Sequence, residues 1–200
     1  MESIYGDRLP QLEAVKEYLE KEIARMRAED KACTGMDPVE HVLARIKSEE
    51  SMREKCTRKG LPQTQHSALV EIHDAIGVRI VTSFLRDIYM IRDQLAVLPG
   101  CRITEEKDYI RHAKPNGYRS YHLILEIRET RETAFDEPVY AEIQLRTISQ
   151  DTWAALEHHL KYKKQVGGNV DLIVQELKRC ADELASTDVS MQTIRDMILE

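Results

Sequence analysis

The stretch VYAEIQLR, residues 139–146, alternates apolar and polar side chains from its first residue to its last. In an extended strand this alternation places the apolar residues on one face and Tyr140, Glu142, Gln144 and Arg146 on the other. The segment therefore predicts a strand of a sheet that has one buried face. A glutamate is disfavoured in mid-strand. Glu142 is therefore either an outward-facing charge or a group suited to metal binding or general-base chemistry.

The rest of the chain mixes predicted strands and helices. Runs of β-branched and apolar residues predict further strands at 75–84, 101–104 and 121–127. Apolar residues spaced three or four apart predict helices at 10–27, 49–59, 87–98 and 170–198. Because strands and helices do not alternate strictly, we expect a mixed α+β sheet rather than a doubly wound one.

Capping and turn residues predict further boundaries. Asp37 followed by Pro38 is typical of a helix start. Thr147 predicts another start, with Gln150 completing a capping box. The polar segment 129–138 is typical of a turn, and Gly167-Gly168 predicts a break in the chain.

Charge and cysteine pattern limit the possible functions. The chain has 200 residues and a net charge of −6, whereas proteins that grip long nucleic acid are usually basic. We therefore expect no extended nucleic acid, and any bound polyanion should be small and meet a local basic patch. The four cysteines lie far apart without a CxxC pair, which indicates a reducing cytoplasm. No apolar run reaches about 18 residues and the start lacks a signal-peptide layout, so we expect no membrane association.

Phosphate-binding side chains are concentrated in RIKSEESMREKCTRKG, residues 45–60. They are Arg45, Lys47, Ser51, Lys55 and Arg58. The first two share a face if residues 45–47 form a strand, and the last three share a helix face. Glutamates in the same segment dilute the charge, so an ordinary solvated helix face is the alternative interpretation.

Asp74 precedes the strand that contains Arg79. A carboxylate at a strand edge suits Mg²⁺, which prefers oxygen ligands together with substrate phosphates. The alternative is that Asp74 caps a turn and pairs with Arg79. His73-Asp74 also matches the dipeptide of metal-dependent HD phosphohydrolases. The pair precedes a strand and no second such dipeptide follows it, so we exclude that interpretation.

HAKPNGYRSYH, residues 112–122, is rich in cationic and aromatic groups. Lys114 and Arg119 suit phosphates, and the Pro-Asn-Gly turn lets the backbone approach a ligand closely. Tyr118 suits base stacking, and His122 would point into the same site. A surface loop whose tyrosines cover the sheet edge is the alternative.

Taken in order, these motifs resemble the synthetase domain of the RelA/SpoT family. The resemblance rests on RIKSEES, D..G.R, K.NGYRSYH, EIQLRT and W..LEH.LKYK, and it covers residues 45–163. The length and the flanking helices resemble the single-domain members, the small alarmone synthetases. The resemblance implies a nucleotidyltransferase-like, mixed five-stranded sheet flanked by helices at residues 44–165. It also implies an N-terminal helical extension at 1–43 and a C-terminal oligomerisation helix at 166–200.

The resemblance also implies a reaction and its site residues. The β,γ-pyrophosphate of ATP moves to the 3′-hydroxyl of GDP or GTP, giving ppGpp or pppGpp. Arg45 and Arg79 sandwich the adenine, and the donor phosphates meet Lys47, Ser51, Lys55, Arg58 and His158. Asp74 and Glu142 bind Mg²⁺, and Glu142 accepts the proton of the attacking hydroxyl. The acceptor nucleotide meets Tyr118 at its base, Lys107, Lys114 and His122 at its phosphates, and Gln144 as an orienting group.

Close relatives are homotetramers assembled through the terminal helices, and the long apolar stripes of these helices agree with an oligomer. Two other functions are possible on this scaffold. One is pyrophosphorylation of a tRNA 3′ end, which the acidic net charge disfavours. The other is a non-catalytic nucleotide- or RNA-binding regulator. The presence of both Asp74 and Glu142 disfavours that role, because a binder needs no paired carboxylates.

Overall fold

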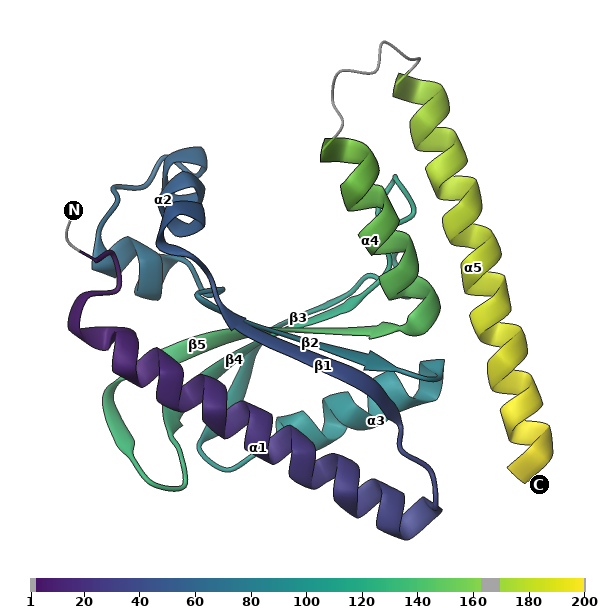
Figure 1. The fold of residues 1–200 in the computed structure, drawn as a ribbon, viewed down its shortest axis with the longest axis horizontal. Coiled ribbons are helices and arrows are strands. Elements are labelled where there is room, and N and C mark those ends of the chain that lie inside the picture. The colour runs from purple at the N-terminus through teal and green to yellow at the C-terminus, as the bar shows by residue number, and fades with distance from the viewer. Residues whose placement is uncertain (1–2, 163–169, 200) are drawn as a thin grey trace.

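The computed structural model describes residues 3–162 and 170–199, and it is built around a mixed five-stranded sheet (Figure 1). The strands are ordered β1 (Val39–Ile46), β2 (Ile76–Thr82), β5 (Ala134–Thr147), β4 (Tyr121–Glu129) and β3 (Cys101–Asp108). All neighbours are antiparallel except β2 and β5, which are parallel. The predicted α+β class with a mixed five-stranded sheet is confirmed.

Helices cover one face of the sheet and rise from the two ends of the other. Helices α1 (Leu9–Thr34) and α3 (Leu85–Ala96) lie across one face, whereas α2 (Glu49–Arg58) and α4 (Ile148–Tyr162) project from the opposite side (Figure 1). A 3-10 turn (Gly6–Arg8) precedes α1, and a π-helical turn (Ser67–Glu71) follows α2. The covered face is apolar because alternate residues of every strand point into the core.

Helix α1 belongs to the common core. Its stripe Leu12, Val15, Leu19, Ile23 and Met26 is buried in the same cluster as the sheet. The predicted boundary between residues 43 and 44 falls inside β1, so residues 39–43 are strand and not part of a helical extension.

The helix predicted to start at Asp37 is wrong, because this segment leads into β1. The Asp37 carboxylate accepts a hydrogen bond from the backbone N–H of Val39 at 3.0 Å and pairs with Arg27 at 2.8 Å. Gly35, at φ 78°, ends α1 just before it. Pairing with β2 along the whole of β1 outweighs the local capping signal.

Other boundaries shift outward from their predicted places. The segment predicted as a turn is partly strand, since β5 already begins at Ala134. Strand β3 extends to Asp108 because it pairs with β4 as far as Tyr121. The capping box is confirmed, with reciprocal bonds of 3.3 and 3.2 Å between Thr147 and Gln150. The predicted break at 167–168 and the boundary after residue 165 lie outside the described residues.

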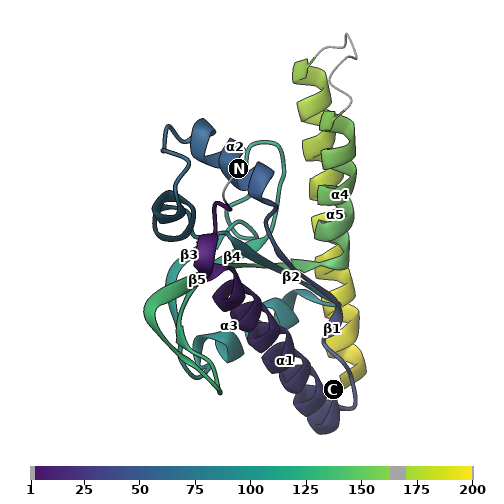
Figure 2. The same cartoon turned by 60° about the vertical axis from the view of Figure 1, so that its left-hand side comes forward.

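Helix α5 (Val170–Leu199) runs beside α4 in both views and reaches α3 with its C-terminal half (Figure 1, Figure 2). The Trp153 indole N–H donates to the carbonyl of Leu177 at 2.9 Å. Arg195 forms a buried ion pair with Asp87 at 2.6 Å. These contacts fix one side of α5 on the domain. None of the helices in the described part of the chain is long and apolar enough to cross a membrane.

Candidate active site

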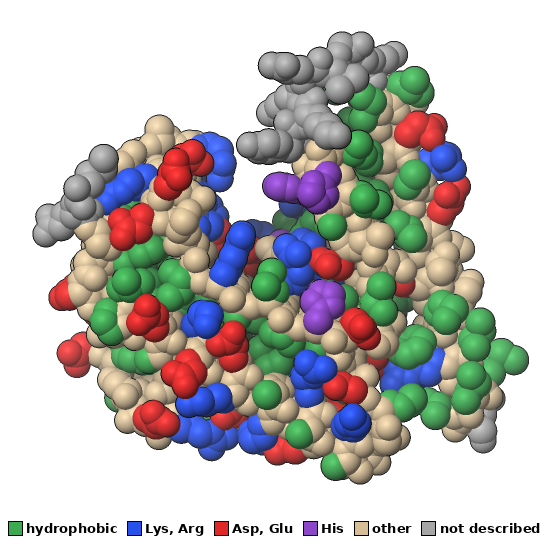
Figure 3. All heavy atoms as spheres, viewed as in Figure 1, with side chains coloured by type: hydrophobic (Ala, Val, Ile, Leu, Met, Phe, Trp, Pro, Cys, Tyr) green, Lys and Arg blue, Asp and Glu red, His purple; other side chains and the backbone are tan. Residues whose placement is uncertain are grey.

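The strand register gathers polar residues from all five strands on the open face of the sheet. One row of cross-strand partners runs Leu43, Arg79, Gln144, His122 and Lys107. The next row runs Arg45, Gly77, Glu142, Ile124 and Glu105. Because Gly77 has no side chain, the floor between Arg45 and Glu142 stays open. Figure 3 shows the molecule hollowed between the α2 and α4 projections, with lysine, arginine and histidine side chains at the base of the hollow.

On the α2 side of this hollow, Asp74 is held by two lysines. Its Oδ2 atom accepts hydrogen bonds from the Nζ atoms of Lys47 and Lys55. Its Oδ1 atom is buried and has no hydrogen-bond partner within residues 3–162 and 170–199. Burial lowers the pKa of Lys47, and the hydrogen bond and charge of Asp74 oppose that shift. Lys47 and Lys55 therefore form a cationic pair with an available carboxylate oxygen between them.

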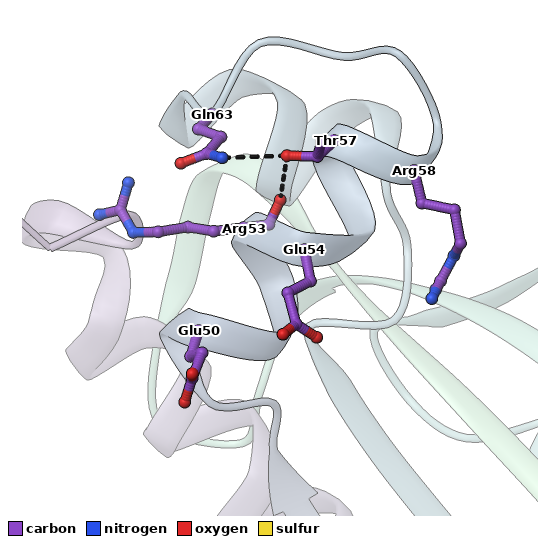
Figure 4. A pocket seen from close by; sticks show the side chains of 6 residues that line it. All are labelled: Glu50, Arg53, Glu54, Thr57, Arg58 and Gln63. Atoms are coloured by element: carbon purple, nitrogen blue, oxygen red, sulfur yellow. Dashed lines mark hydrogen bonds between the residues drawn. The ribbon is translucent and has the colours of Figure 1, made fainter. Parts of the chain in front are cut away.

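Ser51 and Arg58 are exposed along α2 and make no contact with this pair in the described residues. The Ser48 hydroxyl caps the helix by accepting from the backbone N–H of Ser51 at 3.3 Å. Arg58 lines a surface pocket of about 700 Å³ together with Glu50 and Glu54. In Figure 4, Arg58 points away from that pocket's Arg53 side. In this large pocket the carboxylates of Glu50 and Glu54 offset the charge of its two arginines.

Arg79 lies at the centre of the open face, where its guanidinium pairs with Asp151 of α4 at 3.3 Å. Burial and then the charge of Arg146 lower the pKa of Arg79. Arg45 is exposed on the neighbouring strand and faces the same side. His158, on α4, is also exposed, and its ring lies 6.3 Å from that of His159.

A second, smaller pocket of about 200 Å³ lies over β3, β4 and β5. Its lining residues are Glu105, Lys107, Tyr109, Lys114, His122, Leu123, Ile124 and Glu142. Four of the predicted site residues meet there: Lys107, Lys114, His122 and Glu142. The two lysines face two carboxylates, since Glu105 also lines the pocket and pairs with Lys107.

Glu142 is fixed in this pocket by two neighbours. Its carboxylate is 3.3 Å from Nδ1 of His122 and accepts from Nε2 of Gln144 at 2.9 Å. Burial alone would raise the pKa of Glu142, but the hydrogen bond and charge of His122, with Gln144 and Lys55, hold that pKa at about 2. Glu142 is therefore ionised at every physiological pH.

Arg146 is a site residue that the sequence did not single out. It is 5% exposed and donates to the Tyr118 hydroxyl at 2.9 Å, to Gln144 Oε1 at 3.0 Å and to Asp151 at 2.9 Å. The Tyr118 hydroxyl is also 2.8 Å from Nε2 of His122. Arg146 therefore links Tyr118 and Gln144 to Asp151 of α4. Its place on the polar face of the alternating strand is the signal that would have found it.

The acceptor loop, residues 112–122, brings Lys114 and Tyr118 together. The Lys114 Nζ lies 4.8 Å from the ring centroid of Tyr118 and 4.5 Å from that of Tyr109.

His73, the residue before Asp74, is held by two contacts outside this loop. Its ring stacks on Tyr140 at 4.0 Å and contacts the carbonyl of Val70. The exclusion of the HD phosphohydrolase interpretation therefore agrees with the contacts of His73.

The donor set of the site fits a magnesium ion. The described residues hold no group of three or more metal-ligating side chains. They do hold two carboxylates, Asp74 and Glu142. Lys55 donates a hydrogen bond to Asp74, and its charge helps to lower the pKa of Glu142. Mg²⁺ is commonly held by one or two carboxylates plus substrate phosphates, and the unpartnered Asp74 Oδ1 is available as a ligand.

A lysine pair at Asp74 and a lysine-lined pocket at Glu142, on the open face of a mixed sheet, fit an enzyme that transfers phosphoryl groups between two small polyanions. Comparison with known proteins agrees. The family model described as "Region found in RelA / SpoT proteins" matches residues 44–167. The chain belongs to the RelA/SpoT family.

Relatives of known name share most of the chain. The GTP pyrophosphokinase YwaC of Bacillus subtilis is 43% identical over 164 residues, which cover 80% of this chain and 76% of YwaC. The small alarmone synthetase 1 from Bacillus subtilis, solved bound to its product pppGpp, superposes with a TM-score of 0.83 at 28% identity over 96% of both chains. Small alarmone synthetase 2 from the same organism gives 0.80 at 37% identity, over 96% of this chain and 98% of that one.

Proposed function

We propose that the chain is a GTP pyrophosphokinase that transfers the β,γ-pyrophosphate of ATP to the 3′-hydroxyl of GDP or GTP, giving ppGpp or pppGpp. The observation that carries the proposal is Glu142, an ionised carboxylate in a lysine-lined pocket, set beside the separate lysine pair at Asp74. Two small polyanions need two places with local positive charge, and lysines supply it at both although the chain is acidic. The relatives named as GTP pyrophosphokinases support the same reaction.

The donor nucleotide lies on the α2 side of the hollow in this proposal. Lys47, just after β1, and Lys55, on α2, meet its phosphates, and Ser51 and Arg58 lie on α2 as well. Arg45 and Arg79 face the same side of neighbouring strands, where their planar guanidinium groups suit the two faces of an adenine ring. We place His158 at the edge of the donor site.

The acceptor nucleotide occupies the smaller pocket. Lys107 and Lys114 meet its phosphates, and Tyr118 stacks its base. His122 and Gln144 hold Glu142 in place and border the acceptor. In the transfer, the acceptor 3′-oxygen bonds to the β-phosphorus of ATP, the bond from that phosphorus to the α,β-bridging oxygen breaks, and AMP leaves. The hydroxyl proton passes to Glu142.

A pKa of about 2 makes Glu142 a weak base, but the proposed step does not require a strong base. Phosphoryl transfer passes through a loose transition state, so the enzyme contributes mainly positioning and charge stabilisation. Asp74 and Glu142 would hold Mg²⁺, which supplies positive charge across the transferring phosphates. We further propose a cytoplasmic location, which the four free cysteines support.

We also propose that the chain assembles as a homotetramer through its terminal helices. Helix α5 supports this, because its outer side leaves large apolar residues exposed. They include Ile173, Met191, Ile194 and Ile198, which the helical repeat places on one side of α5. An apolar side of this length is typical of a protein–protein interface. In this division of the chain, residues 44–165 carry the chemistry and residues 166–200 the assembly.

A transfer assay tests the proposed reaction. Purified protein is incubated with Mg²⁺, ATP labelled at its γ-phosphate, and GDP, GTP, GMP or tRNA in turn. We expect label on GDP or GTP together with an equal amount of AMP. Label on tRNA alone would favour the tRNA-modifying alternative. Nucleotide binding with no label transferred to any acceptor would favour the non-catalytic regulator and contradict the proposal.

A further inference from the structure

The acceptor loop is packed directly against helix α5. The loop between β3 and β4 reaches the α4 and α5 projection in Figure 1. Gly117 has a φ of +91°, and a Cβ atom built on it would lie 2.6 Å from the Cβ of Ala181 and 3.1 Å from the Cα of Lys178. Glycine is therefore required there both by backbone conformation and by the closeness of the helix.

Arg119 fastens the same loop to the helix by hydrogen bonds. Its Nη2 donates to Oδ1 of Asp182 on α5 at 3.0 Å, and its Nη1 donates to the carbonyl of Ile110 at 3.0 Å. The Arg119 side chain is 21% exposed, so solvent screens the ion pair only in part. Ile110 lies near the start of the β3–β4 loop and Arg119 near its end, so the Arg119 guanidinium connects both ends of the loop to the helix.

Helix α4 holds the loop from the other side. The Asn116 amide donates to Glu157 at 3.1 Å, and the Asn116 Oδ1 accepts from the backbone N–H of Tyr118 at 3.2 Å. The ring of Trp153 lies 6.4 Å from that of Tyr118, while its N–H donates to Leu177 of α5. Both helices therefore share in placing Tyr118.

The turn geometry couples these contacts to the acceptor groups. The backbone N–H of Gly117 donates to the carbonyl of Lys114 at 2.8 Å, and the N–H of Lys114 donates to the carbonyl of Tyr118 at 3.1 Å. A shift of the turn against α5 would therefore move Lys114 and Tyr118 together.

From these contacts we propose that α5 is a positioning element of the acceptor site, in which Gly117 and Arg119 transmit the position of the helix to Lys114 and Tyr118. The proposal rests on the proposed function, since it assigns the smaller pocket to the acceptor. It gives α5 two roles, with the acceptor loop on its inner side and the exposed apolar residues on its outer side. Acceptor affinity should then depend on how α5 is docked.

Steady-state kinetics of Arg119→Gln and Asp182→Asn test the proposal. We expect each variant to raise the KM for GDP about 1.5-fold to fivefold, the range for loss of a partly exposed ion pair, with the KM for ATP unchanged. The double variant should be no worse than the stronger single variant, because both remove the same contact. Arg86→Gln is the matched control. It breaks the 2.8 Å pair with Asp196 on α5, far from the loop, and should leave the KM for GDP unchanged.

Two results would overturn the proposal. One is an unchanged KM for GDP in both single variants. The other is a rise as large in the Arg86→Gln control, which would show that helix docking in general, not the loop contact, is responsible. Asp182 is a partly exposed surface residue, so its variant tests the contact even if Arg119→Gln fails to fold.

Calorimetric titration of GDP into the same proteins separates this proposal from the proposed function. If the wild-type protein binds GDP but transfers nothing to it, the proposed function fails. Weaker GDP binding by Asp182→Asn alone would then still support the positioning role, and equal binding would overturn it.

Discussion

Glu142 is a carboxylate whose neighbours keep it both ionised and oriented. His122 and Gln144 contact its two oxygens, so its place over the pocket floor does not depend on the acceptor. Replacing Glu142 with Gln keeps the shape and removes the charge. We expect Glu142→Gln to lower kcat for transfer about a hundredfold to ten-thousandfold, the usual contribution of a positioned base, while ATP and GDP still bind.

Label-transfer kinetics and calorimetric binding of both nucleotides measure this prediction. Glu105→Gln is a suitable control, because Glu105 lines the same pocket and pairs with Lys107 rather than with His122. We expect that control to keep most of its kcat. Normal turnover by Glu142→Gln would remove Glu142 from the chemistry.

Tyr118 combines a ring and a hydroxyl that have different tasks. The hydroxyl accepts from the buried Arg146 and contacts His122, whereas the ring is the proposed stacking surface. Tyr118→Leu should raise the KM for GDP about fivefold to a hundredfold, as expected when base stacking on an aromatic ring is lost. Tyr118→Phe keeps the ring, so its KM for GDP should stay near that of the wild type.

The same pair of variants reports on the hydroxyl. Tyr118→Phe leaves a buried donor of Arg146 without its partner, which should lower the free energy of unfolding by about 1–3 kcal/mol. Urea unfolding measures that loss. Equal KM values for GDP in the Phe and Leu variants would show that the ring does not stack on the acceptor.

At the scale of elements, helix α5 is docked partly through a buried acid. Asp188 is 7% exposed and accepts from the Thr147 hydroxyl at 2.6 Å, at the start of α4. Burial raises the pKa of Asp188, and hydrogen bonds from Thr147 and Ser149 reduce that rise. Because the folded pKa lies above the unfolded one, stability from this group is present at low pH and is lost as the pH rises through the folded pKa.

Asn in place of Asp188 keeps an oxygen acceptor and cannot ionise. We therefore expect the stability of Asp188→Asn, relative to the wild type, to increase as the pH rises from about 4 to about 7. Thermal unfolding at several pH values measures it, with Asp196→Asn as a partly exposed control on the same helix. A stability difference that is flat or falls over this range would contradict the raised pKa.

The sequence predicted best those elements in which the spacing of apolar residues matches the spacing of buried side chains. The alternation at 139–146 matches the structure, because side-chain period follows backbone geometry and the apolar residues of this strand are buried. The apolar spacing at 170–198 predicted a helix there but not its docked side, where Ala181 and Asp188 are the buried residues. The prediction at Asp37 was wrong because a capping residue signals only local preference, and the pairing of β1 with β2 is non-local.

The site shows the same division between local pattern and long-range contact. Short-range spacing was enough to place Lys47 and Lys55 near one another, and both reach Asp74. The alternation at 139–146 placed Arg146 on the polar face of its strand, but its bond to Tyr118 joins residues far apart in the chain, as does the packing of Gly117 on Ala181. No local pattern could predict these two contacts. Which residues bind each nucleotide remains a prediction from the family resemblance.

At the scale of the whole molecule, the two sides of α5 have opposite character. The inner side is fixed by buried polar contacts such as Arg195–Asp87, while the outer side exposes large apolar residues along much of its length. Leaving such a stripe in water is unfavourable by about 25 cal/mol for each Å² of apolar surface. In the proposed homotetramer, copies of the chain would bury this stripe against one another.

Glutamates on this outer side should break the assembly without unfolding the domain. Ile194 and Ile198 are 49% and 76% exposed, so Ile194→Glu with Ile198→Glu removes little core packing. We expect the mass from light scattering to fall from an oligomer to a monomer, because unpaired carboxylates are costly to bury at an interface. Val97→Glu is the control, since Val97 is 79% exposed after α3 and outside α5. An oligomer of unchanged mass in the double variant would place the interface elsewhere.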